Sequence, residues 1–342
     1  MPTASAAPEQ LPESYRALRV ELAGSRAIRT VVSLPSSELP DHDVTVRVSH
    51  SSLNYKDALS ASGNRGVSKS YPHTPGIDAA GVVITSRDPR FSTGTRVLVT
   101  GYDLGMNTPG GLAELIRVPG DWLLELPAGL DARSAMALGT AGFTAALALR
   151  RLQAVGAGPE LGPFVVTGAS GGVGCLAVAL LARAGYEVVA STGKAHAAER
   201  LLALGAARCL ARQELAGDDS ARPLAPAVYG GGIDTIGAAT LAGLVKRTVI
   251  GGAVAACGLV GGSELALSVF PFVLRGVSLL GVDSQHTAMA ERREVWRLLA
   301  GDWRLDPLGV PGLVNEVGLE ELEGPIRQIL AGDSIGRVLV RL

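Results

Sequence analysis

The sequence predicts an α/β protein in which a doubly wound parallel sheet is inserted into a β-rich domain. Three observations support this fold class. The first third of the chain alternates short apolar segments with turn residues, and the middle alternates strands with helices. The chain then ends in an apolar segment that no helix follows.

The first third is predicted to form short strands. Two segments alternate apolar and polar residues, and two more are short apolar runs bounded by Gly, Pro, Asp and Ser. These four segments are Ala17–Leu22, Val44–Val48, Gly81–Thr85 and Arg96–Thr100. Strands this short, at such a spacing, are typical of a small barrel or sandwich.

The middle of the chain is predicted to begin with a helix and to continue as a βαβ array. Segment Ser134–Leu152 is rich in Ala and Leu, and Asp131 is a candidate N-cap. We expect strands at Phe164–Thr167, Glu187–Ser191, Arg208–Ala211, Gly232–Thr235 and Ala253–Cys257, and helices at Gly172–Ala184, Ala195–Leu204 and Ala239–Val249. Strands that alternate with helices form a parallel, doubly wound sheet.

The last part of the chain defines the predicted domain division. A strand is expected at Ser278–Val282, a helix at Ala290–Leu299 and a final strand at Gly336–Leu342. Because no helix follows the final strand, we expect it to return to the first domain. The prediction is a flexible extension at residues 1–16, a β-rich catalytic domain at 17–137 and 283–342, and an inserted domain at 138–282.

Composition excludes several classes of protein. The 342 residues are 47% hydrophobic with a formal net charge of -1, so neither a nucleic acid nor a membrane is expected as a partner. The sequence has no run of about 18 strongly apolar residues, and its start lacks the basic residues of a signal peptide. The cysteines Cys175, Cys209 and Cys257 are far apart, which predicts reduced thiols and a cytoplasmic location.

Residues 167–174 read Thr-Gly-Ala-Ser-Gly-Gly-Val-Gly, between a predicted strand and a predicted helix. This is the context of a dinucleotide-binding turn, because glycines let the backbone approach a pyrophosphate and the helix N-terminus presents free N–H groups to it. Ala169 replaces the first glycine of the G-x-G-x-x-G pattern. The alternative is a glycine-rich bend that binds no ligand.

The end of the second strand of this array indicates which cofactor is bound. Enzymes that use NAD usually carry an acidic residue there, whereas this chain has Thr192-Gly193-Lys194. A hydroxyl and an ammonium group attract a 2′-phosphate, and Arg212 after the third strand can add a second cation. The pattern therefore predicts NADPH. In the alternative, Lys194 is a solvated lysine at the start of a helix.

No metal site is expected. A catalytic zinc needs three protein ligands and a structural zinc four. The three scattered cysteines show no ligand spacing with any of the five histidines, which are His42, His50, His73, His196 and His286. An enzyme of this kind suits a substrate that needs no metal to polarise it, such as an activated carbon–carbon double bond.

Several stretches resemble zinc-free medium-chain dehydrogenases/reductases. They are residues 51–57 (SSLNYKD), 75–81 (PGIDAAG), 140–145 (TAGFTA) and 165–174 (VVTGASGGVG). Residues 88–91 (DPRF), 110–114 (GGLAE), 255–259 (AACGL) and 281–284 (GVDS) are similar to the acrylyl-CoA reductase branch, whose members are also described as quinone oxidoreductases. Zinc-bearing relatives have Gly-His-Glu and a cysteine ligand where this chain has Gly76-Ile77-Asp78 and Ser51-Ser52.

The resemblance runs from about residue 17 to the C-terminus and implies a GroES-like catalytic domain around a Rossmann domain. It also implies reduction of acryloyl-CoA to propanoyl-CoA with NADPH, with Tyr55 beside the nicotinamide. By position, the pyrophosphate contacts are Ser170, Gly171, Gly172 and Val173, and the 2′-phosphate contacts are Thr192, Gly193, Lys194 and Arg212. Further cofactor contacts are Leu259, Val273, Ser284 and Arg337.

Tyr55 and Asn54 are the candidate catalytic residues. Hydride transfer to an enoyl thioester leaves an enolate that needs preorganised donors, and the α-carbon then takes a proton. Tyr55 either donates this proton or only positions the nicotinamide, and Asn54 either faces the site or is a structural turn residue. Asp57 is expected at a helix start, with Lys56 as a possible ion-pair partner. For the phosphates of coenzyme A the candidates are Arg65, Lys69 and Arg90, which otherwise belong to a solvated surface.

Three other functions remain open at this point. A quinone reductase would share the fold and the cofactor but would bind a flat, uncharged substrate. A non-catalytic NADPH-binding protein would reduce neither an enone nor a thioester, and an enoyl reductase serving a synthase would take longer acyl chains. A homodimer is expected because the apolar strand Ser278–Val282 lies near a sheet edge and would otherwise be exposed.

Overall fold

The computed structural model of the protein describes residues 11–217 and 222–342. Of the predicted extension at residues 1–16, residues 1–10 lie outside the described part of the chain. Its last three residues are not an extension, because the first strand, β1, already begins at Ser14. The described chain forms two units, with residues 11–140, 285–300 and 306–342 in unit 1 and residues 141–217, 222–284 and 301–305 in unit 2.

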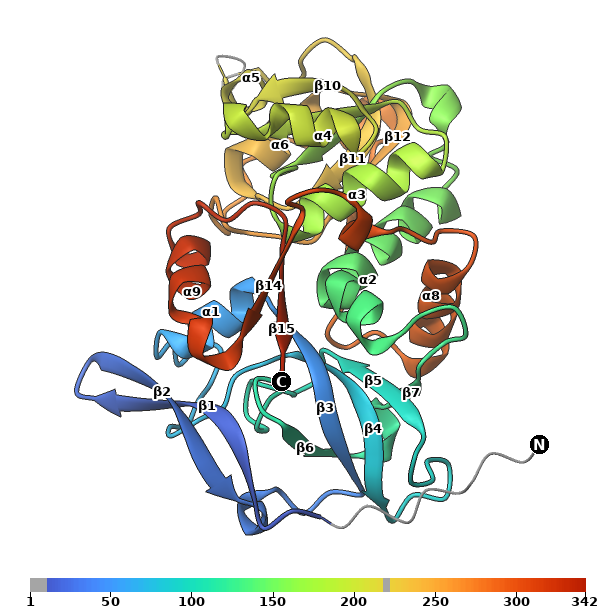
Figure 1. Cartoon of the computed structure of the whole chain (residues 1–342). Coiled ribbons are helices and arrows are strands. Elements are labelled where there is room, and N and C mark those ends of the chain that lie inside the picture. Colours follow the sequence, from blue (N-terminus) through green and yellow to red (C-terminus); the bar gives the residue numbers. More distant parts are fainter. Residues whose placement is uncertain (1–10, 218–221) are drawn as a thin grey trace. The chain divides into compact units, whose positions relative to one another are not determined.

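Unit 1 contains a two-stranded sheet and a seven-stranded sheet. The larger sheet has the order β14-β15-β3-β4-β5-β7, with β6 also paired to β3, and only β14 and β15 run parallel to each other. The strands of unit 1 are β1 (Ser14–Ala23), β2 (Arg26–Pro35), β3 (Val44–Leu53), β4 (Asp78–Ser86), β5 (Arg96–Thr100), β6 (Leu115–Val118), β7 (Leu124–Glu125), β14 (Val314–Gly318) and β15 (Arg337–Arg341) (Figure 1).

The C-terminal strand returns to the first part of the chain, as predicted. Strand β15 pairs antiparallel with β3, with Val338 opposite Leu53 and Arg341 opposite His50. Residues almost 300 positions apart in the sequence therefore share one sheet. This pairing brings Arg337, the first residue of β15, to the end of β3 where Asn54 follows.

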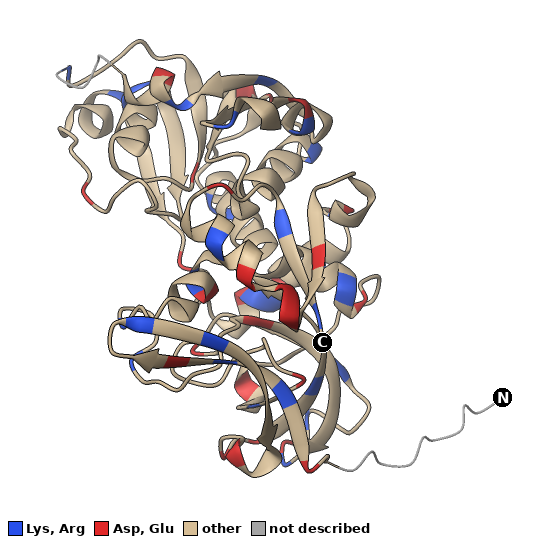
Figure 2. Ribbon diagram, turned by 60° about the vertical axis from the view of Figure 1, so that its left-hand side comes forward, with Lys and Arg blue, Asp and Glu red and all other residues tan. Residues whose placement is uncertain are grey.

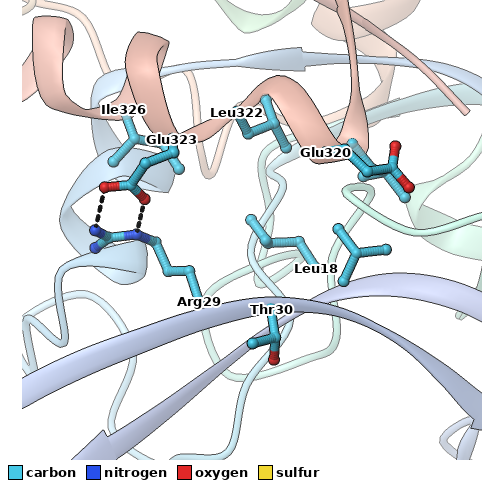
Figure 3. Close-up of a pocket in the computed structure, with 9 residues that line it drawn as sticks. Leu18, Arg29, Thr30, Glu320, Leu322, Glu323 and Ile326 are labelled. Atoms are coloured by element: carbon cyan, nitrogen blue, oxygen red, sulfur yellow. Dashed lines mark hydrogen bonds and ion pairs between the residues drawn. The ribbon is translucent and has the colours of Figure 1, made fainter.

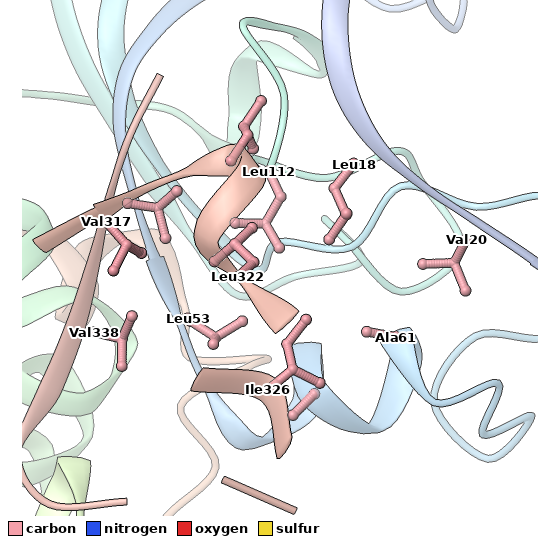
Figure 4. Packing of buried hydrophobic residues seen from close by; sticks show 12 residues of the cluster. Leu18, Val20, Leu53, Ala61, Leu112, Val317, Leu322, Ile326 and Val338 are labelled. Carbon is pink, nitrogen blue, oxygen red and sulfur yellow. The ribbon is translucent and has the colours of Figure 1, made fainter. Parts of the chain in front are cut away.

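The helices of unit 1 are α1 (Tyr55–Ala61), α8 (Met289–Ala300) and α9 (Glu323–Leu330), together with the first part of α2 (Ala132–Ala154). Helices α1 and α9 pack side by side. A buried cluster joins them to β1, β3, β14 and β15, and Figure 4 shows its members, including Leu18, Leu53, Leu322, Ile326 and Val338. Burying such side chains stabilises a fold by about 1.5–3 kcal/mol each.

Unit 2 confirms the predicted doubly wound parallel sheet. Its six strands have the order β10-β9-β8-β11-β12-β13, and every neighbouring pair is parallel. They are β8 (Phe164–Thr167), β9 (Val188–Thr192), β10 (Ala206–Ala211), β11 (Tyr229–Asp234), β12 (Thr248–Ala256) and β13 (Ser278–Gly281). The helices are the rest of α2, then α3 (Gly172–Arg183), α4 (Ala198–Ala203), α5 (Arg212–Ala216), α6 (Ala238–Lys246) and α7 (Phe270–Arg275) (Figure 1).

The predicted boundaries of two helices in this unit were wrong, and β11 and β12 begin earlier than the predicted Gly232 and Ala253. The helix expected at Ala195–Leu204 is a 3-10 turn, η4 (Ala195–Ala197), followed by the short α4. The helix expected to reach Val249 ends at Lys246, because Thr248 and Val249 already belong to β12. These two residues are β-branched, which favours the strand.

Helix α2 is kinked at Gly139, whose φ of 53° and ψ of −154° are not helical. The break ends one helical segment and starts another at Thr140, which is also the last residue of this stretch of unit 1. Figure 2 shows basic and acidic positions interspersed within each unit. Across residues 11–217 and 222–342, a helix with the length and apolar character to cross a membrane is absent.

Candidate active and cofactor site

The glycine-rich turn of unit 2 has the geometry of an anion cradle. Strand β8 ends at Thr167, Gly168 adopts a φ of 59°, and α3 starts at Gly172 with Gly171 as its N-cap. A Cβ atom on Gly174 would lie 2.2 Å from the carbonyl oxygen of Gly168, so only glycine lets the helix pack this closely on the turn. The free N–H groups of the helix start are therefore held over the end of the strand, where they favour a phosphate.

The strand order places this turn at the centre of the sheet. Strands β9 and β10 lie on one side of β8, and β11, β12 and β13 lie on the other. The order reverses between β8 and β11, and in open α/β sheets a ligand binds at the carboxyl ends of the strands beside such a switch point. The turn after β8 is therefore at the position expected of a dinucleotide-binding crevice.

The residues predicted to select the cofactor lie together at the ends of β8, β9 and β10. The Thr192 hydroxyl donates a hydrogen bond to Ser170 Oγ at 3.0 Å, and the Lys194 backbone N–H donates to Thr192 Oγ1 at 3.1 Å. A Cβ atom on Gly193 would lie 3.3 Å from Arg212 Nη2, so the guanidinium group packs over this glycine. The Arg212 guanidinium group thus lies at Gly193 and the backbone of Lys194 lies beside Thr192, and these residue types fit a 2′-phosphate.

The predicted cofactor contacts are divided between the two halves of the strand order, β8–β10 and β11–β13. Gly171, Gly172 and Val173 belong to the turn and to the first residues of α3, on the β8–β10 side with the Lys194 group. Leu259 follows β12, Val273 lies on α7 and Ser284 follows β13, so these three belong to the β11–β13 side. Leu259 and Val273 are 65% and 68% exposed, which leaves both side chains accessible.

Tyr55 stands at the start of a helix in unit 1. Strand β3 ends at Leu53, Asn54 is the N-cap, and Tyr55 is the first residue of α1, with 43% of its surface exposed. Asp57 Oδ2 accepts a hydrogen bond from the Asn54 backbone N–H at 2.7 Å, which confirms the predicted role of Asp57 at the helix start. The Lys56 ammonium group donates to the side-chain carbonyl of Gln285.

Asp78 is the centre of a buried hydrogen-bond network that includes Asn54, the residue before Tyr55. Its Oδ2 accepts from Ser52 Oγ at 2.6 Å and from Asn54 Nδ2 at 2.8 Å. The backbone N–H of Thr140 donates to the same oxygen at 2.9 Å, and the Thr140 hydroxyl donates to Oδ1 at 2.5 Å. Both oxygens of a fully buried carboxyl group are satisfied in this way.

Arg337 completes this network. Its side chain, on a residue only 3% exposed, donates from Nε to the Ala137 carbonyl at 3.1 Å and from Nη1 to Asn54 Oδ1 at 3.2 Å. The amide of Asn54 is therefore bound at both ends, by Asp78 at its nitrogen and by Arg337 at its oxygen. These contacts favour the interpretation of Asn54 as a residue that positions Tyr55.

Asp57 has an unusual protonation equilibrium. Burial raises the pKa of its carboxyl group to about 7 from 3.8, and the nearby Asp78 acts in the same direction. The backbone N–H groups of Gly76 and Ile77 donate to Asp57 Oδ1 at 3.1 and 2.8 Å, and the hydrogen bonds from Asn54 and Ile77 lower the pKa of Asp57. The carboxyl groups of Asp57 and Asp78 thus share one buried region and both accept hydrogen bonds from Asn54.

The positions that hold zinc in metal-bearing relatives have other roles in this structure. Ser52 donates to Asp78, Ile77 is an apolar residue with 4% exposure, and Asp78 is saturated by its donors. Among the residues that the structure describes, His, Cys, Asp and Glu form no group of three suited to a metal ion.

The sequence reasoning missed five site residues in two hydrogen-bonded clusters. Ser52, Asp78 and Thr140 belong to the Asp78 network of unit 1, and in unit 2 the Thr167 hydroxyl donates to Asp234 Oδ1 at 2.6 Å. One signal was available for Asp78, since it stands in the place of the Glu of the Gly-His-Glu stretch. Asp234 could have been found as an acidic residue at the end of a predicted buried strand, where an unpaired charge is costly.

A separate cavity in unit 1 lies apart from these clusters. It has a volume of 350 Å³, and its walls come from β1, β2, the 3-10 helix η7 (Leu319–Glu321) and α9 (Figure 3). Leu18, Leu322 and Ile326 line it, and Arg29 closes one side by donating to both carboxylate oxygens of Glu323, at 2.7 and 2.9 Å. None of the predicted site residues is among its lining residues.

Comparisons with known proteins agree with this geometry. The family of alcohol dehydrogenase GroES-like domains matches residues 40–128, and the zinc-binding dehydrogenase family matches residues 172–301. The chain is 44% identical to acrylyl-CoA reductase AcuI of Ruegeria pomeroyi, over 91% of this chain and 93% of that protein.

Two solved structures cover almost the whole chain. The structure of Escherichia coli K-12 YhdH with bound NADPH is 46% identical, with a TM-score of 0.89, over 95% of this chain and 99% of that one. The structure of Bacillus subtilis yhfP with bound NAD is 43% identical, with a TM-score of 0.92, over 96% of this chain and 99% of that one.

Proposed function

The chain belongs to the medium-chain dehydrogenase/reductase family, and from this premise we propose that it reduces acryloyl-CoA, or a similar short enoyl thioester, with NADPH and without a metal ion. The observation that carries the proposal is the near full-length similarity to an acrylyl-CoA reductase, combined with a cofactor turn of the required shape. The product is the saturated thioester, propanoyl-CoA for the three-carbon substrate.

The residues of unit 2 fit NADPH. A Cβ atom on Gly174 would overlap the backbone of the turn, so this glycine lets α3 pack closely on it and present its N-terminus to a phosphate. Ser170 and the N-terminus of α3 would hold the pyrophosphate, and Lys194 and Arg212 would hold the 2′-phosphate. The E. coli relative is a structure with bound NADPH, which supports this choice, whereas the B. subtilis relative is a structure with bound NAD.

When bound, NADPH supplies a hydride to the β-carbon of the enoyl thioester, and a proton at the α-carbon completes the reduction. The role of this chain is to position the reactants and to deliver that proton. Tyr55 is the candidate for both tasks, because its phenol is exposed while the turn below it is fixed by Asn54, Asp57 and Asp78. A donor that is held rigidly loses little entropy when it meets the substrate.

The first experiment follows NADPH oxidation by the purified protein with acryloyl-CoA, crotonyl-CoA and a simple quinone. We expect rapid turnover of acryloyl-CoA and slow turnover of the other two. A Tyr55→Phe variant should lose about 10²-fold or more in kcat if Tyr55 is the proton donor, the range typical of general acid catalysis. If the phenol only positions the nicotinamide, the same variant should retain most of its kcat.

A matched control is Tyr15→Phe, which removes a hydroxyl from a buried tyrosine of the same unit. This variant should keep the kcat of the wild-type protein. Turnover of the quinone alone would replace the proposed reaction by quinone reduction, and binding of NADPH without turnover of any of the three substrates would indicate a non-catalytic role.

We also propose that the protein is a cytoplasmic homodimer. Strand β13 is an edge strand of the six-stranded sheet, paired only with β12, and its residues are partly exposed. An edge of this kind is commonly covered by a second chain. A cytoplasmic location accords with the three cysteines, which form no disulfide.

A further inference from the structure

Strand β11 ends in Asp234, a carboxyl group with no exposed surface. Its Oδ1 accepts a hydrogen bond from the Thr167 hydroxyl at 2.6 Å. Its Oδ2 accepts from the backbone N–H groups of Gly237 at 2.7 Å and Ile236 at 3.2 Å. Burial raises the pKa of Asp234, and these three donors oppose that effect.

The donors to Asp234 belong to a turn with an uncommon backbone conformation. Gly237 has a φ of 79°, and Ala238, the first residue of α6, has a φ of 46°. A positive φ costs a residue with a Cβ atom about 1–3 kcal/mol and persists only where the surroundings impose it. The Asp234 carboxylate is one such constraint, because it fixes the two N–H groups that precede Ala238.

Backbone hydrogen bonds join the turn 235–238 and the end of β11 to the loop 257–262. The Cys257 N–H donates to the Asp234 carbonyl at 2.9 Å, and the Gly261 N–H donates to the Ile236 carbonyl at 2.8 Å. The two backbones are so close that a Cβ atom on Gly258 would lie 2.1 Å from the Thr235 carbonyl oxygen. The loop that carries Leu259 therefore follows the position of the turn.

The bond between Thr167 and Asp234 spans the switch point of the sheet. Thr167 is the last residue of β8 and directly precedes the phosphate-binding turn, and Asp234 is the last residue of β11. In a doubly wound sheet the two halves bind the two nucleotides of a dinucleotide. The adenosine half of NADPH belongs over β8–β10, where the Lys194 group lies, so the nicotinamide half belongs over β11–β13.

We infer that Asp234 is a positioning residue for the nicotinamide half of the cofactor site, acting through the turn 235–238 and the loop 257–262. The inference deepens the proposed function and rests on its dinucleotide site. Asp234 itself does not contact the cofactor. It sets the backbone against which the nicotinamide nucleotide binds, while the adenosine half depends on Ser170, Lys194 and Arg212.

The test compares two ligands that share the adenosine half. NADPH carries both nucleotides, whereas 2′-phospho-ADP-ribose lacks the nicotinamide ring, and the dissociation constant of each is measured by calorimetry. An Asp234→Asn variant retains the side-chain shape but removes the negative charge and replaces one of the two acceptor oxygens with an N–H₂ donor, which faces either the Thr167 hydroxyl or the backbone N–H groups. We expect its affinity for NADPH to fall about tenfold or more, and its affinity for 2′-phospho-ADP-ribose to change less than twofold.

Two further variants keep the inference testable if Asp234→Asn does not fold. Thr167→Val removes the hydroxyl donor to Asp234 and should cause the same selective loss of NADPH affinity. Thr167→Ser restores a hydroxyl and should recover it. Lys194→Ala is the matched control with the opposite pattern, because both ligands carry the 2′-phosphate and both should bind more weakly.

An equal loss of both ligands in Asp234→Asn and Thr167→Val would overturn the inference, since Asp234 would then only support the unit as a whole. Unchanged NADPH affinity in both variants would overturn it as well. Wild-type protein that binds NADPH without reducing acryloyl-CoA would refute the proposed substrate alone, and the binding data would still decide the role of Asp234. Wild-type protein without dinucleotide affinity would refute both.

Discussion

Asp57 and Asp78 bring two carboxyl groups into one buried region of unit 1, and this has a consequence for stability. Burial and the neighbouring Asp78 raise the pKa of Asp57 to about 7 in the folded protein, from 3.8. The folded state therefore binds the Asp57 proton more tightly than the unfolded state does. The stability that this provides is present below about pH 4 and is lost as the pH rises through about 7.

We accordingly predict that the free energy of unfolding contains a contribution from Asp57 that falls between about pH 4 and pH 7. An Asp57→Asn variant, which cannot ionise, should show a flatter pH profile over this window and lower stability throughout, because it loses an acceptor for the Asn54 N–H. Urea unfolding from pH 4 to pH 8 measures both effects. Parallel profiles for the two proteins would contradict the assigned cause.

In the proposed function, Lys194 is the residue on which the choice of cofactor depends most directly. Its backbone N–H donates to Thr192 Oγ1, the Thr192 hydroxyl donates to Ser170 Oγ, and Arg212 packs over the preceding Gly193. A charge-assisted contact with a phosphate contributes about 1.5–3 kcal/mol. Replacing Lys194 with Ala should therefore weaken NADPH binding about tenfold or more and leave NADH binding unchanged, as measured by fluorescence titration.

A control for this prediction is Arg208→Ala, which removes an exposed cation from β10 in the same unit. It should change neither affinity. If Lys194→Ala weakened NADPH and NADH equally, the lysine would not contact the 2′-phosphate, and the preference for NADPH would need another source.

At the scale of elements, the kink of α2 belongs to the Asp78 network. A Cβ atom on Gly139 would lie 2.5 Å from Ser52 Oγ and 2.6 Å from Asp78 Oδ2, and the φ of 53° at this residue is unfavourable for alanine. Gly139→Ala should therefore destabilise the protein by about 2 kcal/mol or more, through backbone strain and a displaced network. Thermal unfolding measures the change.

A substitution at Gly332 separates the cost of backbone strain from the cost of a displaced network. It has a φ of 75° and no atom within 4 Å of a built Cβ, so Gly332→Ala tests the backbone cost alone. We expect Gly332→Ala to be clearly less destabilising than Gly139→Ala. Equal losses would show that the network tolerates the extra methyl group and that only the backbone conformation requires glycine.

Elements were predictable from the sequence where local pattern and local contacts coincide. The β8 strand and the glycine turn are such a case, because the signal lies within a dozen residues. Strand β2 and helix α9 were missed, since β2 contains charged residues within its apolar pattern and α9 contains Pro325. The Asp78 network could not be predicted from the sequence, because Arg337 is 283 positions away from Asn54 and their contact depends on the pairing of β15 with β3.

At the scale of the whole molecule, the chain order makes unit 1 depend on both ends of the sequence. Strand β15 lies between β14 and β3, so residues 337–341 complete a sheet whose first strand begins at residue 44. Unit 2 is formed almost entirely by one continuous stretch, residues 141–284. The insertion therefore lets the six-stranded sheet form from local βαβ contacts. The Asp78 network, by contrast, requires Arg337 near the end of the sequence to meet Asn54.

The proposed dimer gives the last prediction. Strand β13 contributes its free edge, and nearby side chains such as Val269 and Leu274 are 67% and 60% exposed, an arrangement that a second chain would cover. Light scattering of the wild-type protein should give a mass of two chains. A Leu280→Lys variant places a charge on the edge strand and should shift the mass to one chain.

Leu202→Lys is the matched control for this experiment. Leu202 is 48% exposed on α4, which packs against β10 at the opposite edge of the sheet, so the variant adds a charge far from β13 in the strand order. It should remain a dimer. A wild-type mass of one chain would refute the dimer outright, and a Leu280→Lys variant that stays dimeric would move the interface away from β13. Since the Lys194 group lies on the β8–β10 side, dissociation through β13 should leave the affinity for 2′-phospho-ADP-ribose nearly unchanged, which separates assembly from binding of the adenosine half.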